Sequence, residues 1–188
     1  MRNCGIIVKA SIFAPEIVKF DYMKVRTYVL AIPVALTLMA SGNKQAKPTV
    51  GLNPGDLAPR IESLEKGCSV RFQNQEGRYT LLNFWAVYDA ESRLRNVRLS
   101  NVASQCDTQK VMVCSISLDE MKSVFEETVK TDQLEGTIQW QEAAGKASPV
   151  YKQYKLKQGF RNFLIDDKGV IVAANLTPEQ LAARLKAI

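Results

Sequence analysis

Hydrophobic and polar positions divide the 188-residue chain into three parts. A short apolar segment lies within residues 23–42, a polar stretch broken by prolines covers residues 43–54, and residues 55–188 show the periodicities of a packed domain. In this last part, runs rich in β-branched and aromatic residues predict strands at 70–72, 80–85, 111–118, 163–166 and 170–174. The run at 111–118 is almost wholly apolar, which is typical of a central strand covered on both faces.

Turns and helices connect these strands. Turns at 75–77 and 167–169 predict an N-terminal β-hairpin and a second hairpin near the end of the chain. Helices are expected at 90–105 and 121–129. A last helix begins at Thr177, in the sequence Thr-Pro-Glu-Gln, which has the features of a capping box. Strands that alternate with helices in this way predict an α/β fold.

The apolar segment has the composition of a secretory signal peptide. Met23 is followed by two basic residues, then by about a dozen apolar residues and then by small ones. The apolar run is too short to be a stable membrane anchor. We therefore expect residues 23–42 to be a signal peptide. Residues 1–22 are interpreted as a non-native extension, with a cytoplasmic tail as the alternative, and residues 43–54 as a linker.

The end of this leader resembles the lipobox of bacterial lipoproteins. Residues 38–42 read Leu-Met-Ala-Ser-Gly, with Ser41 at the position of the lipidated cysteine. A serine cannot hold the thioether-linked lipid, so the lipobox is degenerate. We expect an exported product in the bacterial periplasm or cell envelope, where disulfides can form, with membrane contact only through an uncleaved leader.

Composition and charge exclude several functional classes. With 46% hydrophobic residues, the chain can bury one core of ordinary size. Residues 1–41 contain five basic and two acidic residues, a net charge of +3, which leaves +3 of the total of +6 for the rest. That remainder is too small and too scattered for nucleic-acid binding. The chain has no histidine and no C-x-x-C pair, so we expect no metal, no cofactor and no histidine-based catalytic unit.

Several segments resemble thioredoxin-like proteins of bacterial envelopes, the TlpA/ResA type of thiol–disulfide interchange protein. Residues 55–59, Gly-Asp-Leu-Ala-Pro, resemble the opening of the family, and residues 81–86, Leu-Leu-Asn-Phe-Trp-Ala, resemble the strand that enters its active site. Residues 163–166, Phe-Leu-Ile-Asp, with Gly169, resemble the hairpin after its cis-proline. The resemblance covers residues 55–188 and implies a thioredoxin-like fold with a central mixed β-sheet flanked by helices.

The resemblance ends at the residues that carry the family's chemistry. In the family, Trp-Ala leads into an aromatic residue and a Cys-x-x-Cys pair. Here Tyr88 fits the aromatic position, and Asp89 and Ser92 occupy the two cysteine positions. The cis-proline position, counted back from Phe163, falls on Phe160. A carboxylate cannot form a mixed disulfide and a serine cannot resolve one, so we expect the dithiol site to be lacking.

Asp89 also has a structural interpretation. In such sites the first cysteine lies at a helix N-terminus, where the helix dipole and free N–H groups stabilise a thiolate. Aspartate is among the best N-cap residues and brings a negative charge to the same place. We therefore interpret Asp89 as the N-cap of the helix at 90–105 rather than as a catalytic carboxylate.

Three cysteines, Cys68, Cys106 and Cys114, follow the leader. Cys114 lies in the apolar run at 111–118, where a buried inert thiol is expected. Cys68 precedes a strand of the first hairpin and is expected to be the most exposed of the three. A buried stripe on the helix at 90–105 is formed by Leu99, Val102, Ala103 and Cys106. A Cys106–Cys114 disulfide is left open, because the sequence does not give their Cα separation.

Charged residues near the same positions have two interpretations each. A basic edge of the helix at 90–105 is formed by Arg93, Arg95 and Arg98. We interpret it as a solvated face, with an anionic partner site as the alternative. Asp119 and Glu120 follow the apolar run, at the end of the strand where open α/β sheets bind ligands, and are interpreted as loop residues.

These observations predict a non-catalytic, thioredoxin-like envelope protein that binds a protein or peptide partner through the surface of the former active site. The residues assigned to this surface are Trp85, Tyr88, Asp89, Ser92 and Phe160. Trp85 and Tyr88 either line a groove there or complete the core. The alternative is a thiol–disulfide oxidoreductase or antioxidant protein of the TlpA or AhpC/TSA type that uses Cys68, Cys106 or Cys114.

Overall fold

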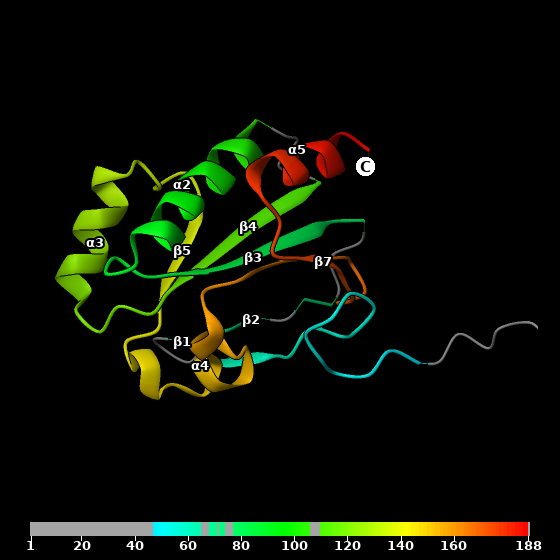
Figure 1. Ribbon diagram of the computed structural model, residues 1–188, viewed down its shortest axis with the longest axis horizontal. Helices are drawn as coiled ribbons and strands as arrows, with labels where there is room; N and C mark the ends of the chain where they lie inside the picture. The colour runs from blue at the N-terminus through cyan, green and yellow to red at the C-terminus, as the bar shows by residue number, and fades with distance from the viewer. Residues whose placement is uncertain (1–46, 65–67, 71, 74–76, 106–109, 188) are drawn as a thin grey trace, which may run out of the picture. The chain divides into compact units, whose positions relative to one another are not determined.

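The computed structural model of the protein describes residues 47–64, 68–70, 72–73, 77–105 and 110–187 (Figure 1). The extension expected at 1–22 and the signal peptide expected at 23–42 fall outside these residues, so both stay predictions. Within the described ranges, no helix combines the length and the apolar character needed to cross a membrane.

Five strands form the main sheet. In spatial order they are β5 (Ile138–Gln141), β4 (Val111–Ser117), β3 (Tyr79–Trp85), β6 (Asn162–Ile165) and β7 (Ile171–Ala174). β3, β4 and β5 run parallel, whereas β6 is antiparallel to both β3 and β7, so the predicted mixed sheet is confirmed. The central strand is β3, and β4, which the apolar pattern placed at the centre, lies beside it.

The N-terminal hairpin uses other strands than those predicted. β1 (Ile61–Leu64) pairs with β2 (Cys68–Val70) in a separate two-stranded sheet. The predicted pairing of strands at 70–72 and 80–85 is therefore wrong, and Cys68 lies within a strand rather than before one. The physical reason is the burial of β3. Its residues from Thr80 to Trp85 are all buried, so this strand needs a neighbour at each edge, and it finds them in β4 and β6.

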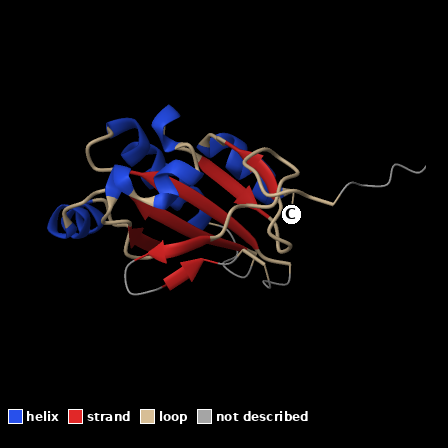
Figure 2. Ribbon diagram, turned by 90° about the horizontal axis from the view of Figure 1, so that it is seen from below, coloured by secondary structure: helices blue, strands red, loops and turns tan. Residues whose placement is uncertain are grey.

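Helices pack against the sheet and connect several of its strands (Figure 2). They are α2 (Ala90–Ser104), α3 (Lys122–Thr131), α4 (Pro149–Gln153) and α5 (Pro178–Lys186), with short 3₁₀ turns at Gly145–Ala147 and Leu156–Gln158. The helices predicted at 90–105, at 121–129 and after Thr177 are confirmed, the last with a complete capping box. The strands β1 and β5 and the helix α4 were not predicted.

The two faces of the main sheet carry separate hydrophobic clusters. α2 and α5 lie on one side of the sheet, and β1, β2 and α4 lie on the other (Figure 1). The cluster beneath α2 includes Leu81, Leu99 and Leu164. The opposite cluster is rich in aromatic residues and includes Phe84, Tyr154, Phe163 and Cys114. In the predicted stripe of α2, Leu99 and Ala103 are buried and Val102 is partly buried, while Cys106 lies outside the described residues.

The folded part of the chain begins before Gly55. The backbone N–H of Gly51 donates to the carbonyl of Leu57 at 3.0 Å, and that of Gly55 donates to the carbonyl of Ile171 at 2.8 Å. Leu52 is buried in the aromatic cluster. The last residues of the segment interpreted as a linker, 43–54, therefore pack against the domain. A single leucine between polar residues gives too little periodicity to reveal this.

Candidate functional site

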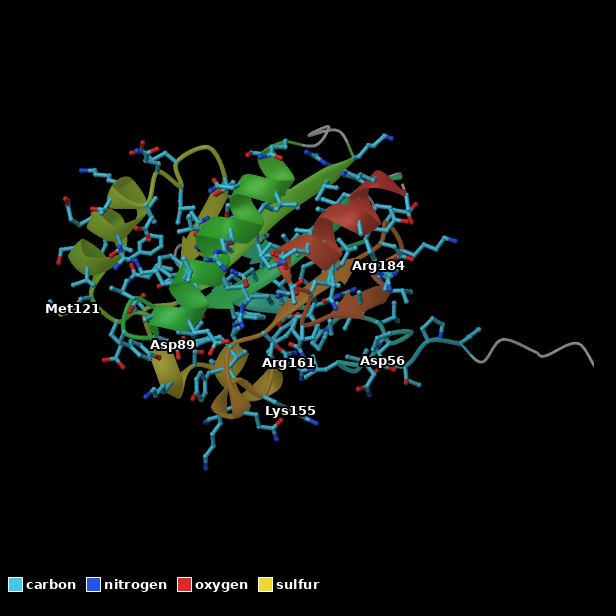
Figure 3. All side chains as sticks on the ribbon, turned by 45° about the horizontal axis from the view of Figure 1, so that its top comes forward. Asp56, Asp89, Met121, Lys155, Arg161 and Arg184 are labelled. Atoms are coloured by element: carbon cyan, nitrogen blue, oxygen red, sulfur yellow. The ribbon has the colours of Figure 1, made fainter. Side chains whose placement is uncertain are left out.

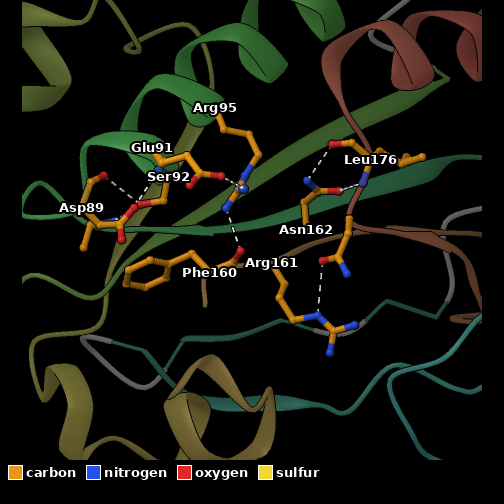
Figure 4. A network of polar contacts seen from close by, with 10 residues as sticks. Asp89, Glu91, Ser92, Arg95, Phe160, Arg161, Asn162 and Leu176 are labelled. Atoms are coloured by element: carbon orange, nitrogen blue, oxygen red, sulfur yellow. Dashed lines mark hydrogen bonds and ion pairs between the residues drawn. The ribbon is translucent and has the colours of Figure 1, made fainter. Parts of the chain in front are cut away.

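Asp89 is the N-cap of α2 (Figure 4). Its backbone is extended, with φ −113° and ψ 96°, and its Oδ1 accepts a hydrogen bond from the backbone N–H of Ser92 at 2.8 Å. The N-cap prediction is thereby confirmed. The carboxylate satisfies one of the free N–H groups at the start of the helix and lies at the positive end of the helix dipole.

Ser92 lies on the buried side of the same turn and forms hydrogen bonds to its backbone. Its side chain is only 1% exposed. The hydroxyl donates to the carbonyl of Asp89 at 3.1 Å and accepts from the backbone N–H of Ala86 at 3.2 Å. Both hydrogen-bonding roles of the hydroxyl are filled by backbone groups. Ser92 therefore supports the turn from the interior and does not lie on the binding surface to which the sequence assigned it.

Phe160 lies beside this turn, on the segment that enters β6. The preceding Gly159 has φ +118°, a value that residues other than glycine rarely adopt. Among the described residues, no peptide bond is cis, including the one before Phe160. The carbonyl of Phe160 accepts a hydrogen bond from Nη2 of Arg95 at 2.7 Å. Its ring lies 6.2 Å from the ring of Tyr88, measured between centroids. Asp89, Tyr88 and Phe160 are thus brought together as the sequence predicted.

Tyr88 and Trp85, left open by the sequence, separate clearly. Tyr88 is 57% exposed, and Nζ of Lys146 lies 5.2 Å from its ring centroid, within the range of a cation–π contact. Partial burial, and then the negative charge of Asp119, raise the pKa of Tyr88. Trp85 is fully buried against Phe125, with centroids 6.2 Å apart. Trp85 therefore completes the core and does not line a surface groove, because β3 is buried from Thr80 to its end.

Asp119 holds the loop that carries Tyr88. Its buried carboxylate accepts from the backbone N–H of Val87 with both oxygens, at 2.8 and 3.1 Å, and from the hydroxyl of Ser117 at 2.6 Å. Sequence reasoning interpreted Asp119 as a loop residue. Its position at the end of β4 placed it at the ligand-binding edge of the sheet, but its backbone partner Val87, 32 positions away, leaves no pattern in the sequence.

Two open grooves flank the turn at Asp89. The first has a volume of about 750 Å³ and lies between the start of α2, the segment before β6 and the loop before α5. The second, of about 440 Å³, is lined mainly by apolar side chains. Asp89 lies on the first groove and Tyr88 on the second. The surface around the turn at Asp89 therefore offers a polar side and an apolar side.

The three arginines of α2 do not act together. Arg93 turns away from the grooves and forms a bidentate pair with Asp132, with both N–O distances at 2.7 Å. The hydrogen bond to Asp132 raises the pKa of Arg93. Arg95 and Arg98 line the first groove. The basic edge expected from the sequence is therefore divided into a structural ion pair and two groove residues.

Cys114 is a free thiol buried in the aromatic cluster, and burial raises its pKa to about 12. It points to the sheet face opposite α2, because its neighbour Val113 lies in the cluster beneath that helix. The disulfide with Cys106 that the sequence left open stays open, because it involves a residue outside the described ranges. Cys106 and the side chain of Cys68 lie outside the described part of the chain. Among described residues, no group of three or more acidic or cysteine side chains could hold a metal ion.

Comparisons with known proteins agree with this geometry. Residues 54–174 match the AhpC/TSA family. A crystal structure of a thioredoxin-like protein from Parabacteroides distasonis is 58% identical and covers 74% of this chain and 99% of its own, with a TM-score of 0.68. A thiol–disulfide oxidoreductase from Bacteroides fragilis is 29% identical and covers 70% of this chain and 98% of its own, with a TM-score of 0.59.

A more distant structure shares the fold alone. The thioredoxin domain of a thiol–disulfide oxidoreductase from Bacteroides vulgatus is 22% identical, covers 73% of this chain and 98% of its own, and has a TM-score of 0.62. The predicted thioredoxin-like fold is therefore confirmed. No curated protein sequence matches the chain.

Proposed function

The chain belongs to the AhpC/TSA family and has a thioredoxin-like fold, and from this premise we propose that it is an exported, non-catalytic member that binds a protein or peptide partner. The observation that carries the proposal is the turn at Asp89 and Ser92. Both side chains are engaged in hydrogen bonds to the backbone at the start of α2. Thiol–disulfide exchange at this place would need a thiolate and a second thiol.

Neither oxygen group is arranged for another reaction. The Ser92 hydroxyl is buried, and general-base activation would need a neighbouring base with a free acceptor. The hydroxyl proton is already donated to the carbonyl of Asp89 at 3.1 Å, and the chain has no histidine, the commonest base for such activation. The carboxylate of Asp89 accepts a hydrogen bond from the backbone N–H of Ser92, which is the interaction of an N-cap. The turn therefore preserves the architecture of the start of α2 without groups that transfer electrons or acyl groups.

The surface around the turn has the properties of a binding surface. Tyr88 is 57% exposed and Met121 is 64% exposed, and both line the apolar second groove with Val124. Exposed apolar groups that gather at one place mark interaction sites, and tyrosine is enriched in them. Asp119 fixes the backbone beside Tyr88, so this ring is presented from an ordered loop.

Export rests on the sequence of the leader. Residues 23–42 have the basic start, the apolar run and the small residues of a signal peptide. The partner would then be a protein or peptide of the cell envelope.

A second function is favoured by one observation. A relative at 29% identity is described as a thiol–disulfide oxidoreductase. In this alternative, Cys68 or Cys106 would carry the chemistry, because the buried Cys114 thiol, with its raised pKa, is unsuited to form the reactive thiolate at neutral pH.

Site-specific photo-cross-linking tests the proposal. A photoreactive phenylalanine analogue replaces Tyr88 in one chain and Arg184, on α5 and well separated from Asp89 in Figure 3, in a control chain. Each is made in the parent and in a background with Cys68→Ser, Cys106→Ser and Cys114→Ala. We expect the chain modified at Tyr88, but not the control, to capture the same envelope protein in both backgrounds.

Turnover assays complete this test. The parent should reduce neither insulin disulfides nor peroxide above the level of a heat-denatured sample. Turnover that disappears in the cysteine-free background would establish the oxidoreductase alternative. Equal capture at Tyr88 and Arg184 would remove the proposed binding surface.

A further inference from the structure

Arginines line the first groove from both of its sides, and we call it the arginine groove. Arg95 and Arg98 come from α2. Arg161 comes from the segment that leads into β6, and Figure 4 shows it together with Arg95. The acidic residues on the groove are Asp89, whose carboxylate caps α2, and Glu91. What the groove can bind depends on which of these charges are already paired.

Two of the arginines have acidic neighbours. Nη1 of Arg95 lies 3.5 Å from Oε1 of Glu91, and its Nη2 donates to the carbonyl of Phe160 at 2.7 Å. Arg98 lies within electrostatic reach of Glu179, an exposed carboxylate in the first turn of α5. These neighbours offset part of the positive charge that α2 brings to the groove.

Arg161 is different. Among the described residues it has no carboxylate partner. Its Nε donates to Oδ1 of Asn175 at 3.2 Å, and its guanidinium carbon lies 5.2 Å from the ring centroid of Phe163. Asn175 is itself fixed, because its backbone N–H donates to the carbonyl of Asn162 at 2.8 Å.

The two contacts hold the guanidinium in place but engage only one of its nitrogens. Nη1 and Nη2 of Arg161 have no hydrogen bond to any residue that the structure describes. A guanidinium presents these two nitrogens as a planar fork that matches the two oxygens of a carboxylate. Since Asn175 and Phe163 already order the side chain, less conformational entropy is lost when the fork is occupied.

We propose that the arginine groove binds an acidic peptide segment of the partner, with one carboxylate of that segment on Nη1 and Nη2 of Arg161. This inference rests on the proposed function, because it names the chemistry of the partner that the former active-site surface binds. Arg98 extends the positive surface of the same groove, and Leu94, which is 50% exposed, offers an apolar contact beside it. A segment that combines acidic residues with one apolar side chain fits this arrangement.

Fluorescence anisotropy with a defined peptide tests the inference on the full chain. The probe is a short fluorescein-labelled peptide, capped at both ends, that carries aspartate and glutamate around one leucine. Its counterpart has asparagine and glutamine at the acidic positions. We expect the acidic peptide to bind more tightly than the neutral one, and its affinity to fall as the salt concentration rises.

Variants then locate the contact. Arg161→Gln should weaken binding by about tenfold, and Arg161→Lys, which keeps the charge but loses the fork, should also weaken it. Arg184→Gln is the matched control, because it removes one exposed arginine that is not on the groove. It should change the affinity by less than about twofold. Thermal melts confirm that each variant is folded.

Equal binding of the two peptides would overturn the inference. Equal effects of Arg161→Gln and Arg184→Gln would overturn it as well, since only the net charge would then matter. If the inference fails while a cross-linker at Tyr88 still captures its partner without cysteines, the binding function stands and the partner has other chemistry. If both experiments fail, the proposed function fails with the inference.

Discussion

The two faces of the main sheet are packed by different kinds of side chain. On the face toward β1 and α4, the rings of Phe84, Tyr154 and Phe163 contact one another with centroids 4.7 to 6.5 Å apart. On the face beneath α2, apolar residues share the space with buried polar ones. These polar residues are Asn83, Asn96, Ser100 and Ser115.

The polar residues beneath α2 form a chain of amides. Nδ2 of Asn83 donates to Oδ1 of Asn96 at 2.8 Å, and Nδ2 of Asn96 donates to Oε1 of Gln139 at 3.3 Å. The carbonyl oxygen of Asn83 and the hydroxyls of Ser100 and Ser115 have no hydrogen-bond partner in the described part of the chain. This face therefore gains less from burial than the aromatic face does.

The contrast between the two faces indicates that different side chains provide the stability of the fold and the geometry of the site. Apolar contacts stabilise a fold but tolerate small shifts, whereas a buried amide pair favours one arrangement. The aromatic face buries large rings, and the amide chain joins β3 to α2, the helix that is capped by Asp89 and contains Arg95. Substitutions on the aromatic face should therefore cause the larger loss in the free energy of unfolding. Substitutions in the amide chain should cause a smaller loss but disturb the position of α2.

The largest effect is expected on the aromatic face. Phe163→Ala removes a fully buried ring that contacts Phe84 and Tyr154, and should lower the free energy of unfolding by about 3–5 kcal/mol. Denaturant unfolding followed by circular dichroism measures the loss. Leu94→Ala, at a half-exposed position of α2, is the control and should cost far less. A loss below about 1 kcal/mol for Phe163→Ala would contradict the assignment of stability to this face.

The amide chain should show a smaller and non-additive effect. Asn96→Ala leaves the groups of Asn83 and Gln139 without their partner and should cost about 1–3 kcal/mol. Asn83→Leu combined with Asn96→Leu removes both polar partners and should cost less than the single change if the larger side chains fit. Denaturant melts of Asn83→Leu, Asn96→Leu and the double variant, compared with the parent in a double-mutant cycle, measure the coupling energy between the two amides. Strict additivity would show that the amides do not act as a pair.

Loss of the N-cap should lower the free energy of unfolding by as much as Asn96→Ala does, or by less. Asp89→Ala removes the acceptor for the N–H of Ser92 and should lower the free energy of unfolding by about 1 kcal/mol. Asp89→Asn should cost less, because the cap survives and only the interaction of the charge with the helix dipole is lost. Denaturant melts of both variants beside the parent decide this. Equal stability of Asp89→Ala and the parent would remove the cap as the reason for aspartate at this position.

The smallest effect concerns Glu142, a buried carboxylate directly after β5. Its Oε1 accepts from the N–H of Ala144 at 3.2 Å, and its Oε2 has no partner among described residues. Burial raises the pKa of Glu142. As the pH rises from the ordinary pKa of glutamate toward this raised value, the unfolded chain loses its proton first. The free energy of unfolding therefore falls across that window and is level above it.

Glu142→Gln cannot ionise and should remove this fall. The variant should be slightly more stable than the parent at neutral pH, and the difference should shrink below the ordinary pKa of glutamate. Denaturant melts over a pH series measure it, with Glu135→Gln, at an exposed position, as the control. A difference between variant and parent that does not change with pH would show that ionisation of Glu142 is not its cause.

Features that depend on neighbours in the sequence could be predicted. The N-cap at Asp89 and the capping box at Thr177 depend on residues three positions away, so their sequence patterns are sufficient. The fold class followed from the alternation of strands and helices and from the resemblance of residues 81–86. Phe160 also falls beside Asp89 as expected, since the fold fixes the segment before β6.

Features that depend on distant partners could not be predicted. β5 is a short edge strand of mixed polarity, which has no clear pattern of its own without the register against β4. Asp119 acts on Val87 from 32 positions away, and Arg161 is ordered by Asn175 from 14 positions away. The burial of Ser92, which the sequence assigned to the binding surface, likewise follows from packing around the sheet. The same packing decides Trp85, which the sequence left open between a groove and the core.

The oxygen atoms at Asp89 and Ser92 have one further consequence. Sulfur at such positions would pass between thiol, disulfide and oxidised acids as the surroundings change, and each form would have its own shape and charge. A carboxylate and a hydroxyl have no such series of states. The turn at the start of α2 therefore keeps one covalent form under reducing and oxidising conditions alike. Under the proposed function, a partner that binds this turn would meet the same side-chain chemistry under both conditions.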